Sequence, residues 1–171
     1  MLRMGLSIMV IAGLLAGSNA SDAGAGEGPA KAAVFDFELI DTSLEGEMMG
    51  KNAAEQRRLG LISDFLRRRL RSSGAYVVLD MGPAAKAVDE AGHLYGCNGC
   101  EAAIARRLGA EVAITGTVQK VSNLILNINL YIRDVATEKR IRTMSVDIRG
   151  NTDETWLRGI SYLLRNQLLA R

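Results

Sequence analysis

Hydrophobic and polar residues alternate at several places along the chain, which is the pattern of strands with one buried face. In the first such run, residues 31–40, Phe35 and Phe37 fall on one side and Asp36 and Glu38 on the other. We therefore predict a strand here, with Phe35 and Phe37 facing the same core.

Helical spacing of apolar residues begins after a polar connection that ends at Gly50. Asn52 can cap a helix that runs to about Ser73, where Gly74 ends it. The buried stripe of this helix is predicted to be Leu59, Ile62, Phe65, Leu66 and Leu70. The pattern then predicts a strand at residues 76–80, a helix at residues 84–90 opened by Pro83, a loop at residues 92–98 and a helix at residues 101–108.

Strict alternation returns in residues 112–118, 123–134 and 139–149. In the middle run Ile128 is followed by Asn129, and this order of apolar and polar positions holds throughout, as in a sheet packed on one side and wet on the other. The links are short, so the three strands should form an antiparallel meander. Thr152 or Asp153 then caps a last helix, whose buried stripe is Trp156, Ile160, Leu163, Leu164 and Leu168.

The predicted element order is β-α-β-α-α-β-β-β-α. This order indicates an α/β (α+β) fold with a mixed sheet of about five strands, a carboxyl-terminal meander and helices mainly on one face. A helix between the early strands implies a right-handed crossover.

The first twenty residues have the features of a secretory signal peptide: Arg3, an apolar run at residues 6–16, and Ser18 and Ala20 before the expected cleavage site. The apolar run is shorter than the roughly 20 residues that cross a bilayer, so no membrane span is expected to remain. No cysteine near the site could accept a lipid. We predict a periplasmic protein with a signal peptide at residues 1–20, a flexible leader at 21–30 and one domain at 31–171.

The composition, 48% hydrophobic and 23% charged, is that of an ordinary globular protein. Because Arg3 is the only charged residue of the predicted signal peptide, the rest of the chain carries 20 basic and 19 acidic residues. This balance argues against a nucleic-acid partner.

Cys97 and Cys100 are the one group with chemical character, and they stand at the start of a predicted helix. In an oxidising compartment two such cysteines usually form a disulfide, and a structural disulfide is the favoured interpretation. A redox-active pair and a metal site remain open. A zinc site would need His93 as a third ligand and Glu101 or Asp89 as a fourth.

Catalysis is not expected. His93 is the only histidine, and Asp36 and Glu38 are better interpreted as a solvated strand face than as an acid and base pair. The sequence has no nucleophile elbow and no phosphate-binding loop after a strand. We predict no catalytic residues, no cofactor and no resident metal.

Two polar surfaces are candidates for partner binding, with plain solvent exposure as the alternative for both. One is the arginine-dense outer side of the helix at residues 52–73, which could meet an acidic protein or anionic lipid headgroups. The other is the polar face of the meander. The candidate residues are Arg57, Arg58, Arg67, Arg68, Arg69, Arg71, Asn127, Asn129, Tyr131 and Arg133.

Residues 104–118 and 134–137 resemble the amino-terminal α/β domain of TolB and the related domains of CsgG-like envelope assembly proteins. Residues 120–127 and 149–156 are similar to a family of secreted proteobacterial proteins of unknown function. The resemblance covers nearly the whole chain after the signal peptide. It implies the same fold and an association with the cell envelope, and for the unnamed family a link to periplasmic quinoprotein dehydrogenases.

We therefore predict a non-catalytic periplasmic binding or assembly module that contacts an envelope or periplasmic protein. The alternatives are a thiol-redox accessory protein that uses Cys97 and Cys100, and a carrier of a small ligand connected with quinoprotein dehydrogenases. The binding or assembly module could also make peripheral contact with a membrane.

Overall fold

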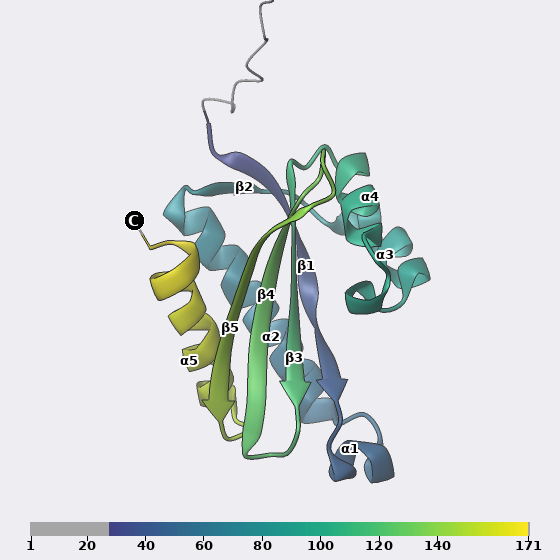
Figure 1. The fold of residues 1–171 in the computed structure, drawn as a ribbon, viewed down its shortest axis with the longest axis vertical. Helices are drawn as coiled ribbons and strands as arrows, with labels where there is room; N and C mark the ends of the chain where they lie inside the picture. The colour runs from purple at the N-terminus through teal and green to yellow at the C-terminus, as the bar shows by residue number, and fades with distance from the viewer. Residues whose placement is uncertain (1–27, 171) are drawn as a thin grey trace, which may run out of the picture.

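The computed structural model describes residues 28–170, so the predicted signal peptide and most of the leader lie outside the described residues. One mixed sheet has the strand order β2-β1-β3-β4-β5 (Figure 1). β1 is parallel to β2 and β3, whereas β3, β4 and β5 form the predicted antiparallel meander. The strands are β1 (Ala30–Asp41), β2 (Tyr76–Val78), β3 (Val112–Lys120), β4 (Ile125–Asp134) and β5 (Arg140–Arg149).

Helices α2 and α5 begin at the predicted capping residues. Asn52 Oδ1 accepts a hydrogen bond of 2.8 Å from the backbone N–H of Ala54, and Thr152 caps the last helix. Gly74 ends the long helix in the left-handed conformation, at φ 68°. The helices are α1 (Leu44–Met49), α2 (Ala53–Ser73), α3 (Ala85–Ala91), α4 (Cys100–Arg107) and α5 (Asp153–Leu163). There are two short 3-10 helices, η1 (Gly82–Ala84) and η2 (Leu94–Gly96), and a π-helical segment, η3 (Leu164–Leu168), that continues α5.

The sequence did not predict α1, which lies in the segment expected to be a polar connection. Ser43 caps α1 by accepting a hydrogen bond from the backbone N–H of Gly46. None of the residues of α1 is buried, so it lacks the apolar stripe that reveals a helix packed on a core.

The two long helices, α2 and α5, cover one face of the sheet, and α3 and α4 cover the start of β1 and β3 on the other face (Figure 1). The main core therefore lies between the sheet and α2 and α5, and includes Ile62, Leu66, Ile128, Trp156 and Ile160. A smaller second core lies under α3 and α4 and includes Phe35, Leu94, Ile104 and Ala105.

Phe35 and Phe37 are both buried, but on opposite faces of the sheet, so the prediction that they share a face was wrong. The reason is a shift in the β1–β3 register between Val34 and Phe37, because an extra residue in a strand reverses the side on which later side chains fall. α2 satisfies the backbone groups freed there. Arg67 donates to the carbonyl of Val34, and Ser63 Oγ accepts from the N–H of Phe37 at 2.9 Å.

Within residues 28–170, no helix is both long enough and apolar enough to cross a membrane.

Candidate functional site

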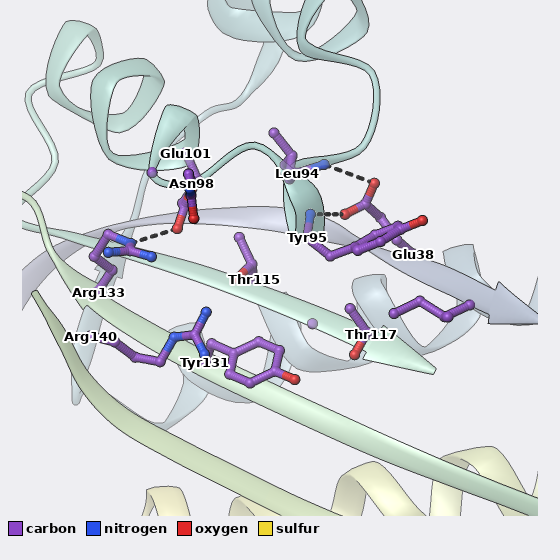
Figure 2. Close-up of a pocket in the computed structure, with 13 residues that line it drawn as sticks. Glu38, Leu94, Tyr95, Asn98, Glu101, Thr115, Thr117, Tyr131, Arg133 and Arg140 are labelled. Atoms are coloured by element: carbon purple, nitrogen blue, oxygen red, sulfur yellow. Dashed lines mark hydrogen bonds and ion pairs between the residues drawn. The ribbon is translucent and has the colours of Figure 1, made fainter. Parts of the chain in front are cut away.

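A polar cleft of about 190 Å³ lies where the segment from η2 to α4 passes over the polar face of the sheet. Figure 2 shows that Thr115 and Thr117 of β3 rise from its floor, with Tyr131 of β4 and Arg140 of β5 beside them. The remaining lining residues are Glu38, Ile40, Leu94, Tyr95, Asn98, Gly99, Glu101, Gly116 and Arg133.

Glu38 fixes one wall of this cleft to β1. Its two carboxylate oxygens accept hydrogen bonds from the backbone N–H groups of Leu94 and Tyr95, at 3.0 and 2.9 Å (Figure 2). His93 Nδ1 lies 3.2 Å from the same carboxylate, and Asp36 is paired with Arg67 at 2.8 Å. Asp36 and Glu38 thus engage separate partners, and the acid and base pair considered from the sequence finds no support in their contacts.

The opposite wall is held by an ion pair between Arg133 Nε and Glu101 Oε1, 2.6 Å apart (Figure 2). The guanidinium of Arg140 lies over the ring of Tyr131, at 4.3 Å from the ring centroid. Two of the four candidate residues on the meander, Tyr131 and Arg133, therefore line the cleft.

The other two meander candidates lie farther along the same face, outside the cleft. Asn127 Nδ2 donates to Ser145 Oγ and Asp147 Oδ1, at 2.9 and 2.7 Å. Asn129 is nearly buried, because Thr117 and Gln119 of β3 flank its side chain. This part of the face is a satisfied network of side chains rather than a set of free hydrogen-bonding groups.

Cys97 and Cys100 form a close pair at the start of α4, with Cα atoms 5.6 Å apart and sulfur atoms at bonding distance. The residues between them, Asn98 and Gly99, have left-handed backbones, at φ 56° and 111°, and line the cleft. The pair therefore closes the turn that forms one wall.

A metal site at the cysteines has few ligands available. In the part of the chain that the structure describes, the group that could hold a metal comprises Cys97, Cys100 and Glu101. The zinc site considered from the sequence needed His93 as a third ligand and Glu101 or Asp89 as a fourth. Glu101 belongs to this group, but His93 and Asp89 do not. Glu101 is already paired with Arg133.

The arginines of α2 do not form one uniform surface. Arg58 and Arg67 are mostly buried and act inside the fold, since Arg58 pairs with Asp153 at 2.8 Å and Arg67 with Asp36. The others, Arg57, Arg68, Arg69 and Arg71, are exposed. The sequence could not separate the two groups, because the contacts that bury Arg58 and Arg67 come from distant elements.

Large apolar side chains are exposed at the end of the molecule where β1 and β3 end. They belong to α1, to the β3–β4 turn and to the first residue of β4, and α1 and the turn lie at the bottom of the view in Figure 1. Their exposed fractions run from 47 to 81%. We call this surface the apolar end; its residues are Leu44, Met48, Met49, Val121, Leu124 and Ile125.

A buried ionic cluster fastens the two parts of the apolar end to the core. Lys120 Nζ lies 2.7 Å from Glu55 of α2, 3.0 Å from Glu45 of α1 and 3.2 Å from Asp41 of β1. Burial lowers the pKa of Lys120, but hydrogen bonds to the three carboxylates outweigh it and hold the pKa above its usual value. Asn123 of the β3–β4 turn donates to Glu45 at 2.7 Å.

A family model described as "Protein of unknown function (DUF2380)" and named DUF3280 matches residues 30–168. The chain belongs to the DUF3280 family. No curated protein matches it. The sequence-based assignment to a family of unknown function is thereby confirmed, while the proteobacterial origin stays a prediction.

Solved structures support the fold of this DUF3280 protein. The LpoB C-terminal domain from Escherichia coli is 17% identical, with a TM-score of 0.51, and covers 74% of this chain and 87% of its own. Lipoprotein GNA1162 from Neisseria meningitidis is 15% identical, with a TM-score of 0.52, and the match covers 82% of this chain and 96% of the GNA1162 chain. TolB from Acinetobacter baumannii is 10% identical, with a TM-score of 0.39. The match covers 81% of this chain and 28% of the TolB chain, and the similarity is too low to support a conclusion about function.

Proposed function

We propose that this DUF3280 protein is a non-catalytic binding or assembly module that works outside the cytoplasm through protein–protein contacts. The apolar end is the observation that carries the proposal. Six large apolar side chains, 47–81% exposed, gather on α1, the β3–β4 turn and the first residue of β4. Asn123 of the turn donates to Glu45 of α1 at 2.7 Å, so the two segments are neighbours, and several exposed apolar side chains on neighbouring segments are typical of a contact surface.

The support beneath the apolar end favours a contact surface over a loosely held loop. Lys120 and its three carboxylates hold α1 against the ends of β1 and β3 and the start of α2. A surface that is held in place before binding loses less conformational entropy when a partner covers it.

The envelope location rests on two observations. The first is the predicted signal peptide at residues 1–20. The second is the fold, which is shared with a protein described as a lipoprotein, GNA1162. This chain is proposed to differ in being unlipidated, because no cysteine stands near the predicted cleavage site.

Affinity capture from a periplasmic extract, with crosslinking, tests the proposal. The parent should capture a discrete partner, and Met48→Glu should lose it because a charge would be buried in the contact. Ile141→Glu is the matched control. Ile141 is 59% exposed and lies at the start of β5, away from the apolar end. Capture that survives Met48→Glu and Leu124→Glu would refute the role of the apolar end.

A thiol-redox function is the second candidate, favoured by the position of Cys97 and Cys100 at the start of α4. A helix start lowers the pKa of a thiol and so promotes exchange chemistry. A reduction-potential titration separates the two functions, because an exchanger has an oxidising potential and a structural disulfide resists reduction. The polar cleft would serve a small-ligand carrier, but its lining is mainly polar rather than apolar.

A further inference from the structure

The outer edge of β1 is paired over only part of its length. β2 pairs with residues 30–32, whereas β1 continues to Asp41 and pairs with β3 on its other edge up to that residue. Beyond the Arg67 and Ser63 contacts at Val34 and Phe37, the last residues of β1 have a neighbouring strand on one side alone.

Alternate residues of a strand direct their backbone N–H and C=O groups to the same edge. The N–H of Thr42 donates to the carbonyl of Lys120 at 2.9 Å, so the even-numbered residues in this part of β1 face β3. The N–H of Phe37 donates to Ser63 Oγ of α2, so the odd-numbered residues face the outer edge. Leu39 and Asp41 therefore direct their backbone groups outward, and no described residue bonds to these groups.

A groove of about 740 Å³ runs along this edge. Gln56 and Leu59 of α2 line it from one side of the sheet and His93 and Tyr95 from the other, and Gly46 of α1 adds to the lining together with Gly50 and Lys51. The unpaired edge of β1 therefore lies at the base of a groove and is accessible from it, whereas the edge at the start of β1 is covered by β2.

The groove is acidic. Four carboxylates line it, those of Asp36, Glu38, Asp41 and Asp89, beside the ammonium of Lys51. Asp36 is paired with Arg67 and Asp41 with Lys120, so among the described residues Glu38 and Asp89 are the lining carboxylates without a lysine or arginine partner. Glu38 is held by backbone N–H groups of Leu94 and Tyr95, which leave its charge uncompensated by a neighbouring arginine or lysine (Figure 2). An occupant with basic side chains would be favoured electrostatically.

We infer that the groove along residues 37–41 of β1 binds an extended, basic segment of a partner protein, which pairs with the free edge of β1 as an additional strand. The inference deepens the proposed function by giving the partner a chemistry. Backbone pairing with Leu39 and Asp41 provides affinity, and the carboxylates select lysine or arginine on the segment. A strand in this position would lie about 4.8 Å from β1.

Two capped hexapeptides test the inference, one alternating lysine and valine and the other alternating glutamate and valine. With the full chain and the lysine peptide, amide exchange at Leu39 and Asp41 should slow and their amide resonances should shift. The glutamate peptide should leave both amides unchanged. Equal responses to the two peptides, or no response at Leu39 and Asp41 to millimolar lysine peptide, would overturn the inference.

Leu39→Pro removes the outward N–H while leaving the β1–β3 hydrogen bonds in place, because proline is tolerated where a strand N–H faces an open edge. Its affinity for the lysine peptide should fall about tenfold, the loss expected from one hydrogen bond of about 1.4 kcal/mol. Leu39→Ala keeps the N–H and should bind like the parent. If Leu39→Pro does not fold, a lysine peptide with backbone N-methyl groups on alternate residues replaces it, and parent-like binding of that peptide would refute strand pairing.

The apolar end provides an independent control. Leu124→Glu, in the β3–β4 turn and outside the lining of the groove, should bind the lysine peptide like the parent, so failure of the peptide experiment and failure of partner capture are separate results. Exchange at Leu39 that slows with protein concentration, in the absence of peptide, would instead make a second copy of this chain the occupant and reject the basic-segment assignment.

Discussion

The ammonium group of Lys120 lies 2.7 Å from Glu55 Oε1, and both side chains are 1% exposed. Asn151 adds a hydrogen bond of 2.6 Å to the same carboxylate oxygen, so the pair ties β3, α2 and the start of α5 together. Glu55 Oε2 is the one buried side-chain polar atom of the described region that lacks a partner. Charges removed from water in this way depend on one another for their stability.

Replacement of Lys120 by methionine should lower the free energy of unfolding by about 3–5 kcal/mol, because it leaves buried carboxylates without their cation. Lys86→Met is the control: Lys86 pairs with Glu90 on the exposed surface of α3, where such pairs contribute at most about 1 kcal/mol. Urea unfolding measures both variants. Similar losses in the two variants would contradict the buried-cluster interpretation.

Asp41 should make the protein less stable in acid. Burial raises its pKa, but hydrogen bonds from the side chain and backbone of Ser43, and from Lys120, hold the pKa below its usual value. The folded state therefore prefers the carboxylate. This stabilisation is present above the unfolded pKa of about 3.9 and is lost as the pH falls through the lower folded pKa.

Asp41→Asn should accordingly reduce stability near neutral pH and flatten the decline in acid. Unfolding free energies measured from pH 7 down to about pH 2 test this, because only an ionised group can produce the difference in slope. Parallel curves for the parent and Asp41→Asn would show that Asp41 does not contribute to the acid sensitivity.

The sequence predicted the sheet, the meander and the main helices because those features depend on local periodicity. The faces of Phe35 and Phe37 could not be predicted, since a bulge has no periodic signal and is fixed by distant contacts from Arg67 and Ser63. Lys120 gave no hint of its buried cluster for the same reason. Its partners are separated from it by 65 residues or more along the chain.

The candidate site was predictable only in part. Tyr131 and Arg133 were expected from strand alternation and do line the polar cleft. α1 carries three exposed apolar residues and is capped by Ser43. The cap could have predicted a helical turn there, but the sequence could not predict that the apolar residues of this turn are exposed. The groove along β1 depends on where β2 stops, which the sequence placed at residue 80 rather than Val78.

Neighbouring positions of β4 should respond very differently to truncation. Ile128 is fully buried in the main core, so Ile128→Ala should cost about 2–5 kcal/mol through lost burial and the cavity left behind. Asn129 lies on the other face with only long hydrogen bonds, 3.4 and 3.5 Å, and Asn129→Ala should cost far less. Chemical denaturation checks the pair, and equal losses would be inconsistent with the assignment of faces.

Export should remove residues 1–20 and leave Ser21 as the first residue. The expectation rests on Arg3, the apolar run at residues 6–16 and the small residues before the cleavage site. Intact-mass measurement of protein recovered from the periplasm tests it. A mature form that still begins at Met1 would remove the basis for an envelope location.

Replacement of Cys97 and Cys100 by serine should lower stability modestly and leave the fold and partner capture intact. A bridge across two residues closes a very small loop, so it removes little entropy from the unfolded chain, and its effect should lie at the low end of the usual range of about 0–5 kcal/mol. The bridge would instead act locally, by holding the turn of Asn98 and Gly99 against the polar cleft. Thermal unfolding and crosslinked capture are compared for the parent and the double variant. If the double variant remains folded but loses its partner or its activity in cells, the structural role of the pair is rejected and the thiol-redox function takes its place.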